Sequence, residues 1–258
     1  MKIGFIGTGN MGGALAQAVA QVPGHQVLLS NHNPAKAQTL AQLTNGTLLS
    51  NQDLVSQADV VFLGVKPYHL ASLTQDLAPL AKPETVWVSM AAGVPLASLA
   101  QHLPLDHTIR IMPNTPVAIG QGMTTYSLAN PDLAPLLEHL LAVSGRLMQL
   151  PENLLDAATA LAGCGPAFVY QMIEALTDAG IEQGLKPSDA QTLVAQTLLG
   201  TAQMTLQSDK HPAQLRQEVT SPGGSTIAGV VSLEKHGFRA ALMEATKAAV
   251  QKTKELGQ

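Results

Sequence analysis

The chain has 258 residues, 46% of them hydrophobic and 12% charged, with a formal net charge of −4, so we expect one large or two modest domains. The low charge and the 3% aromatic content argue against a nucleic-acid-binding protein, and the apolar runs are shorter than the ~18–20 residues that span a membrane. Cys164 is the single cysteine, so no internal disulfide can form, and a reducing cytoplasm is the expected location.

The N-terminus combines an apolar strand, a glycine motif and a helix. Lys2–Ile6 is the predicted strand, Gly7-Thr8-Gly9-Asn10-Met11-Gly12 is the G-x-G-x-x-G motif, and Gly13–Val22 is the predicted helix. The glycines allow a tight turn and close approach of the backbone to a pyrophosphate, whose charge the helix N-terminus stabilises. The motif in this context predicts dinucleotide binding, and an incidental glycine turn is the alternative.

The second predicted strand, Gln26–Ser30, bears on the choice of coenzyme. An NAD site usually has a carboxylate near the end of this strand, but residues 25–51 contain none. Ser30, Asn31 and His32 are neutral donors that suit a 2′-phosphate, and Lys36 adds positive charge nearby. We therefore expect NADPH, with NADH as the second possibility, although His32 and Lys36 are equally consistent with plain solvent exposure.

Further strands alternate with helical segments as far as residue 150. The predicted strands are Gly46–Leu49, Asp59–Val65, Thr85–Ser89, Thr108–Met112, Gly122–Ser127 and Arg146–Leu150. This alternation predicts a doubly wound parallel sheet with helices on both faces. Lys66-Pro67 follows one strand at the edge where such sheets bind ligands. Ala91, Ala92 and Gly93 follow another and leave room for a flat ring, or simply for tight packing.

Strand signals stop after Pro151. The predicted helices there are Asn153–Leu161, Pro166–Gln183, Ser188–Gln207, Gln214–Glu218, Thr226–Lys235 and Phe238–Leu256. The change of period predicts an α/β fold with two domains: a Rossmann-like dinucleotide-binding domain at 1–150 and an all-helical domain at 151–258. Helix 166–183 is apolar around much of its circumference, which favours contact with another subunit over a self-contained core.

A glycine-rich stretch between two predicted helices, Glu218–Gly229, suits a small anion. Pro222, Gly223 and Gly224 favour an unusual backbone path, and we expect Ser225 or Thr226 to cap a helix that starts near Ile227. Free N–H groups at that helix start would bind a carboxylate, and an ordinary glycine-rich turn is the alternative.

Several catalytic arrangements are missing from the sequence. The eight histidines have no spacing suited to a metal, and there is no G-x-S-x-G serine motif. We interpret Cys164 as a small packed residue at a helix start and Glu218 as a solvated carboxylate at a helix end. Catalysis is therefore expected to depend on the cofactor and on positioning.

Five motifs occur in a characteristic order and at characteristic separations: Phe5–Gly12, Val65-Lys66-Pro67, Met112-Pro113-Asn114-Thr115-Pro116, Gly163-Cys164-Gly165-Pro166 and Val219–Ala228. Together they resemble the motifs of the pyrroline-5-carboxylate reductase family. The resemblance spans nearly the whole chain. It implies reduction of the C=N bond of L-1-pyrroline-5-carboxylate to L-proline by hydride transfer from NADPH or NADH.

The resemblance also implies residue roles. The amides of Ser221 and of Gly223, Gly224, Ser225 and Thr226 would hold the substrate carboxylate, and the Thr226 hydroxyl would orient the imine nitrogen. Gly7–Gly12 would hold the pyrophosphate. The other implied cofactor contacts are Ser30, Asn31 and Asn51 near the ribose, and Val65, Lys66, Pro67, Ala91, Ala92, Gly93 and Asn114.

The resemblance further implies an assembly. Family members form homodimers through the helical domain, combine the substrate loop of one chain with the cofactor domain of another, and in many cases assemble into rings of dimers. Two positions depart from the family pattern: Cys164 replaces a serine, and no arginine follows Ser30-Asn31-His32.

Two other functions remain as alternatives. One is a β-hydroxyacid-dehydrogenase-like reductase, which would be expected to have a catalytic lysine on the long helix, whereas residues 165–183 contain no lysine. The other is a non-catalytic protein that senses NADP or serves as a scaffold, which would have no reason to retain the Ser-Pro-Gly-Gly loop.

Overall fold

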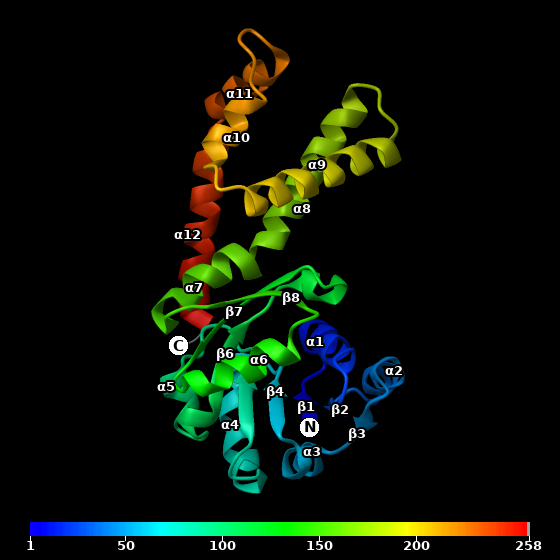
Figure 1. Ribbon diagram of the computed structural model, residues 1–258, viewed down its shortest axis with the longest axis vertical. Coiled ribbons are helices and arrows are strands. Elements are labelled where there is room, and N and C mark those ends of the chain that lie inside the picture. The colour runs from blue at the N-terminus through cyan, green and yellow to red at the C-terminus, as the bar shows by residue number, and fades with distance from the viewer. Residues whose placement is uncertain (257–258) are drawn as a thin grey trace. The chain divides into compact units, whose positions relative to one another are not determined.

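The computed structural model describes residues 1–256, which form two compact units (Figure 1). The first unit consists of Met1–Cys164 together with the end of the last helix from Ala248, and the second consists of Gly165–Lys247. Among the described residues, no helix is both long and apolar enough to cross a membrane.

A single sheet forms the centre of the first unit. Its strands are β1 Lys2–Ile6, β2 Gln26–Ser30, β3 Thr47–Leu48, β4 Val60–Leu63, β5 Val86–Ser89, β6 Thr108–Met112, β7 Gly122–Leu128 and β8 Gly145–Gln149. They lie in the order β3-β2-β1-β4-β5-β6-β7-β8. The order reverses between β1 and β4, because β1 pairs with both β2 and β4. Doubly wound sheets bind ligands at such a switch point, outside the carboxyl ends of the strands.

Two strands, β7 and β8, run against the predicted parallel direction. β7 pairs antiparallel with β6, with Ile111 opposite Tyr126, while the other pairs are parallel. The segment from Pro113 to Gln121 contains only a 3₁₀-helix at Thr115–Ile119. A parallel return needs a crossover of a dozen or more residues, and this segment is too short to provide one. The expectation of a parallel sheet was therefore wrong at β7 and at β8, which runs parallel to β7.

Helices cover both faces of the sheet, as expected for a Rossmann-like fold. The helices of this unit are α1 Asn10–Ala20, α2 Pro34–Thr44, α3 Asn51–Gln57, α4 Pro67–Leu77, α5 Leu96–Leu99, α6 Ala134–Leu140 and α7 Leu155–Ala158. Side chains of α1, α2 and α6 pack into one core cluster, and side chains of α3, α4 and α5 pack into the other. Phe5 and Phe62 stack in the first cluster with ring centroids 4.7 Å apart. Burial on both faces explains why the central strands are almost continuously apolar.

The second unit is wholly helical. Its elements are α8 Gly165–Glu182, α9 Pro187–Gln207, α10 Pro212–Glu218 and α11 Ser225–Lys235, and α12 Phe238–Leu256 begins here and ends in the first unit. Within residues 165–247 the one buried side chain is that of Ala190. Large exposed apolar side chains are spread over its helices; they include Tyr170, Leu176, Leu193, Leu199, Met204, Leu206, Val231, Leu233 and Met243. A unit with so little internal core needs a partner surface to bury these side chains.

The junction between the units is less regular than predicted. The expected helix Asn153–Leu161 is instead a 3₁₀-turn at Glu152–Leu154, the short helix α7 and a π-helix at Thr159–Gly163. The two compact units divide after Cys164. The domain boundary that we placed after residue 150 stays a prediction.

Candidate active site

The glycine motif forms the turn between β1 and α1, and its three glycines have different structural requirements. Gly7 has φ +86°, and a Cβ there would lie 2.7 Å from the carbonyl carbon of Gly64. A Cβ on Gly12 would overlap the Gly7 carbonyl oxygen, whereas a Cβ on Gly9 would meet nothing within 4 Å. Gly7 and Gly12 thus permit the turn and the packing, while Gly9 leaves open space where a ligand can approach the backbone.

A cavity of about 720 Å³ lies at the switch point beside this turn. It is lined by Gly7, Gly9, Asn31, His32, Asn33, Lys36, Gly64, Val65, Lys66, Tyr68, His69, Ser72, Leu73 and Asp76. The lining comes from the carboxyl ends of β1, β2 and β4 and from α2 and α4. The helix α1 begins at Asn10, three residues before the predicted Gly13, with Gly9 as its N-cap residue. Its first N–H groups therefore belong to the motif itself and are available to a phosphate.

The end of β2 shapes one wall of the cavity with neutral groups. Ser30 is buried, and the Asn31 side chain donates a hydrogen bond to the Thr8 hydroxyl (2.8 Å) and accepts one from the Asn33 N–H (3.0 Å). Asn31 thereby fixes the strand end to the glycine turn. His32 and Lys36 are exposed and line the cavity, so a hydrogen-bonding ring and one ammonium group lie on the β2 side of the cavity. This arrangement fits a 2′-phosphate better than a free ribose hydroxyl.

The residues expected on the nicotinamide side lie at the ends of β4 and β5. Val65 and Lys66 line the 720 Å³ cavity, while Lys66, Pro67 and Ala92 line a neighbouring cavity of about 630 Å³. Ala91 is buried, and Gly93 has φ +77°. The loop after β5 is therefore a tight turn of small side chains, as a flat ring requires. The burial of Ala91 and the positive φ of Gly93 also require small residues, with or without a bound ring.

Asn51 and Asn114, which were also expected to contact the cofactor, do not line the 720 Å³ cavity. Asn51 is the first residue of α3, next to the N-cap residue Ser50. Asn114 is buried, and its side chain accepts from the Met123 N–H (2.9 Å) and donates to the Ala162 carbonyl (3.0 Å). These bonds give Asn114 a role in holding two loops, and contact of Asn51 or Asn114 with the cofactor stays a prediction.

The expected anion site lies at the start of α11. Gly223 has φ +70°, the Gly224 N–H donates to the Ser221 carbonyl (3.1 Å), and the helix begins at Ser225. Gly224 is the N-cap residue and no side chain caps the helix, so the expectation that Ser225 or Thr226 would cap a helix from Ile227 was wrong. Gly223 has a left-handed conformation and Gly224 becomes the N-cap residue, so the helix starts two residues earlier than expected. The exposed Ser225 and Thr226 therefore lie inside its first turn. Their N–H groups have no partner within the helix and suit a carboxylate.

Glu218, which precedes this loop, is paired with a cation. Its carboxylate lies 2.5 Å from the Lys210 ammonium, and both side chains are about half exposed. The pair supports the interpretation of Glu218 as a surface carboxylate. Surface pairs of this kind contribute little free energy of folding.

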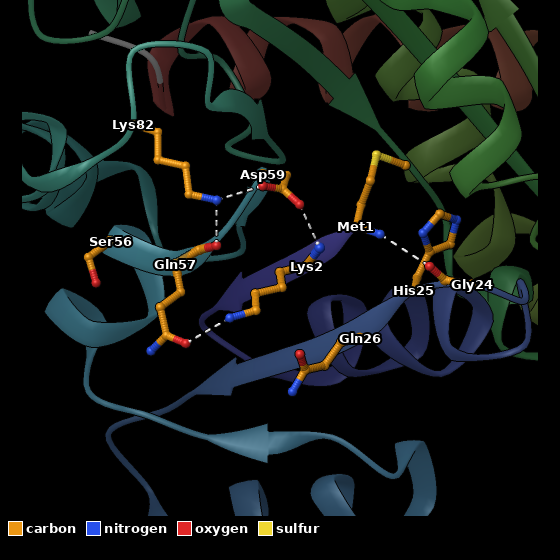
Figure 2. A pocket seen from close by; sticks show the side chains of 9 residues that line it. All are labelled: Met1, Lys2, Gly24, His25, Gln26, Ser56, Gln57, Asp59 and Lys82. Carbon is orange, nitrogen blue, oxygen red and sulfur yellow. Dashed lines mark hydrogen bonds and ion pairs between the residues drawn. The ribbon is translucent and has the colours of Figure 1, made fainter.

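A further cavity, of about 710 Å³, lies at the amino ends of β1 and β2 (Figure 2). Its polar groups are mostly bonded to one another: the Lys82 ammonium lies 2.6 Å from Asp59 Oδ1, and the Lys2 N–H donates to Asp59 Oδ2 (2.8 Å). These bonds hold the pKa of the Asp59 carboxyl below its usual 3.8. Ligands of doubly wound sheets bind at the opposite, carboxyl edge, so we interpret this cavity as structural.

A partly buried ionic cluster around Arg110 was not predicted from the sequence. Arg110, in the middle of β6, has a side chain only 4% exposed, and its guanidinium contacts Glu152 Oε1 (3.3 Å) and Asp156 Oδ1 (2.9 Å). A single arginine within the apolar segment Thr108–Met112 was the available signal, because a buried cation requires a partner. Within residues 1–256, no three histidine, cysteine or carboxylate side chains lie together in a way that would hold a metal.

Two protein families match the chain. Residues 152–256 match the family described as pyrroline-5-carboxylate reductase dimerisation. Residues 2–93 match the family described as NADP oxidoreductase, coenzyme F420-dependent. The first match covers the helical part with the Ser-Pro-Gly-Gly loop, and the second covers the glycine turn and the strands around it.

Individual relatives match over nearly their full lengths. The pyrroline-5-carboxylate reductase of Pisum sativum is 39% identical over 98% of this chain and 95% of its own. That of Synechocystis sp. is 40% identical over 100% and 99%. The crystal structure of pyrroline carboxylate reductase from Plasmodium falciparum with NADP bound is 31% identical and superposes with a TM-score of 0.89 over 100% of this chain and 98% of that one.

Proposed function

This chain belongs to the pyrroline-5-carboxylate reductase family, and from that premise we propose which of its residues perform the reduction of L-1-pyrroline-5-carboxylate to L-proline with NAD(P)H. The observation that supports the assignment most directly is the open space at Gly9, beside a 720 Å³ cavity at the switch point. A phosphate-binding turn needs a glycine there for its missing side chain, while Gly7 and Gly12 are needed for the fold alone.

The glycine turn holds the cofactor. The N–H groups from Gly9 to Gly12 face the pyrophosphate, and the N-terminal end of α1 stabilises its charge. Val65, Lys66, Pro67 and Ala92 line the cavities on the nicotinamide side. Ala91 and Gly93 belong to the same loop as Ala92 and shape it. When bound, the reduced nicotinamide supplies the hydride that reduces the C=N carbon.

The loop at the start of α11 holds the substrate. The N–H groups of Ser225 and Thr226, at the helix N-terminus after the Gly223 turn, bind its carboxylate. The Thr226 hydroxyl is exposed and free to orient the imine nitrogen. A cyclic imine protonated in water is already electrophilic, so Thr226 orients the ring and need not donate a proton.

NADPH is the preferred coenzyme in this proposal. His32 and Lys36 line the cavity beside the end of β2, where residues 25–51 provide no carboxylate to accept a ribose hydroxyl. NADH is expected to bind more weakly, because the 2′-phosphate contacts are then absent.

The chain also assembles with copies of itself, since its helical part matches a dimerisation family. The exposed apolar side chains of residues 165–247 support a homodimer formed through these helices, and further assembly into a ring of dimers is the larger arrangement that we propose. A cytoplasmic location fits a chain whose single cysteine is unpaired.

The test follows the loss of reduced-nicotinamide absorbance with L-1-pyrroline-5-carboxylate, in parallel with NADPH and NADH. We expect rapid substrate-dependent oxidation and a higher kcat/KM with NADPH. NADPH binding without turnover would contradict the substrate assignment, because a dinucleotide-sensing protein gives that result. A thermal shift with NADPH that increases further with proline would support the carboxylate-binding loop independently.

A further inference from the structure

We propose that Glu152, held by Arg110, is a positioning residue for the loop that faces the nicotinamide. The loop connects β5 to α5 and consists of residues 90–95, including Ala92. The inference rests on the proposed nicotinamide location beside this loop. Glu152 lies 56 residues further along the chain than the backbone group that it binds.

The contact that makes Glu152 more than a surface carboxylate is its bond to the backbone of α5. Glu152 Oε1 accepts a hydrogen bond from the Leu96 N–H at 2.6 Å. Leu96 is the first residue of α5, and its N-cap residue, Pro95, has no side chain that can accept this N–H. The carboxylate therefore satisfies an N–H that the short helix leaves without a partner, and it fixes the end of loop 90–95.

The start of the same loop is held by the neighbouring strand. Ser89, the last residue of β5, accepts the Ala91 N–H through its hydroxyl (3.3 Å), and Ser89 lies opposite Arg110 in the pairing of β5 with β6. The Met90 N–H donates to the Leu63 carbonyl on β4 (3.1 Å). Both ends of the loop are thus bonded to fixed groups, one through β4 and β5 and the other through Glu152.

Arg110 fixes the position of Glu152. Its guanidinium, almost fully buried, contacts Glu152 Oε1 (3.3 Å) with one nitrogen and Asp156 Oδ1 (2.9 Å) with the other. The same Glu152 oxygen thus accepts from both Arg110 and Leu96. Arg110 Nε has no hydrogen-bond partner among residues 1–256, so the guanidinium depends on these two carboxylates for compensation of its buried charge.

The arrangement links two parts of the reductase along the chain. Glu152 is the first residue of the segment that matches the dimerisation family, yet it accepts a hydrogen bond from Leu96, the first residue of α5, directly after loop 90–95. A reacting ring displaced by about 1 Å loses up to a hundredfold in rate, so a carboxylate that sets the loop position affects the hydride-transfer step without touching the cofactor.

The experiment compares full-length variants at two carboxylates that share Arg110. Glu152→Ala removes the bond to Leu96, Glu152→Gln retains an acceptor for it, and Asp156→Asn is the matched control that changes Arg110 but has no contact with Leu96. Each variant is measured for kcat, for the isotope effect with NADPH deuterated at the transferred position, and for its affinity for NADPH relative to adenosine 2′-phosphate 5′-diphosphate, which lacks nicotinamide.

We expect Glu152→Ala to lower kcat by about ten- to a hundredfold and to raise the isotope effect, while binding of the nicotinamide-free fragment is unchanged. Glu152→Gln should recover most of the rate, and Asp156→Asn should lower thermal stability without changing the isotope effect. Equal losses of kcat in Glu152→Ala and Asp156→Asn, or parallel losses of NADPH and fragment affinity, would overturn the inference.

Two further variants keep the result interpretable. If Glu152→Ala does not fold, Glu152→Asp keeps the charge beside Arg110 but withdraws the oxygen from Leu96, and it should raise the isotope effect; an unchanged isotope effect would count against the inference. Ala92→Leu tests the ring location on which the inference rests. If Ala92→Leu lowers the ratio of NADPH affinity to fragment affinity but the Glu152 variants have no effect, the nicotinamide location stands and only the role of Glu152 is rejected. If Ala92→Leu has no effect, the nicotinamide location itself is rejected.

Discussion

Replacing Gly9 and Gly12 separately by alanine should separate cofactor binding from folding. The two residues belong to one turn, but a Cβ on Gly9 would point into open space and a Cβ on Gly12 would overlap the Gly7 carbonyl oxygen. Gly9 also has ordinary extended backbone angles, φ −70° and ψ −164°, that alanine adopts without strain. We therefore expect Gly9→Ala to fold normally and to bind the cofactor poorly.

The magnitudes follow from the two environments. For Gly9→Ala, loss of unfolded-chain entropy stabilises by about 0.4–1 kcal/mol, and a poorer N-cap residue costs about 0.5–1 kcal/mol, so the net change is within about 0.5 kcal/mol. Overpacking at Gly12 costs about 1–3 kcal/mol. A Cβ on Gly9 that displaces one N–H bond to a charged phosphate costs about 1.5–3 kcal/mol, which weakens binding roughly ten- to a hundredfold.

Urea unfolding without cofactor and NADPH titration by fluorescence provide the two measurements. Gly12→Ala should lower the unfolding midpoint, whereas Gly9→Ala should leave it near that of the wild type and raise the Kd for NADPH. The reasoning is refuted if Gly9→Ala binds NADPH as tightly as the wild type, or if both variants lose the same free energy of unfolding.

Three further predictions concern other residues. Thr226→Ala should lower kcat about tenfold, the effect of one lost hydrogen bond, with NADPH affinity unchanged, and equal losses of both would exclude its orienting role. Desolvation and the bond to Glu138 (2.7 Å) raise the pKa of buried Tyr126 to about 12. The Tyr126 phenol therefore contributes its full stabilisation below pH 10, and this contribution is lost as the pH rises toward 12. Urea unfolding of Tyr126→Phe should lack this loss. The Lys82 hydrogen bond lowers the pKa of the partly exposed Asp59 carboxyl, so the contribution of Asp59 to stability is present above pH 3.8 and is lost as the pH falls through the lowered pKa. Asp59→Asn should cost about 0.2–1 kcal/mol at pH 7, and urea unfolding should show that this cost shrinks as the pH falls below 3.8.

The features that sequence reasoning predicted are those encoded by neighbouring residues. An apolar strand, three glycines at fixed spacing and an alanine-rich segment are contiguous, so Lys2–Ile6 and the glycine turn were placed correctly. The Ser-Pro-Gly-Gly loop was also recognised from local composition, and the start of α11 was misplaced by only two residues. The helix began at Ser225 because Gly223 adopts positive φ and Gly224 then serves as the N-cap residue, a choice that depends on backbone angles.

The features that were missed depend on residues far apart in the chain. The direction of β7 follows from the short connection after β6, and alternation of strand and helix signals does not reveal it. The two carboxylates that pair with Arg110 lie 42 and 46 residues later in the chain. No local sequence pattern indicates that Glu152 accepts a hydrogen bond from the Leu96 N–H. Asn114 was recognised by its motif, but its bonds to two backbone groups emerged only from the fold.

The near absence of a core in residues 165–247 has a consequence for how the enzyme behaves on dilution. Ala190 is the one buried residue there, so most of the free energy that orders these helices has to come from association. By mass action, the unfolding temperature should therefore rise with total protein concentration, and apparent stability is inseparable from subunit abundance. A chain synthesised in small amounts would expose apolar helices to proteases for longer before a second copy covers them.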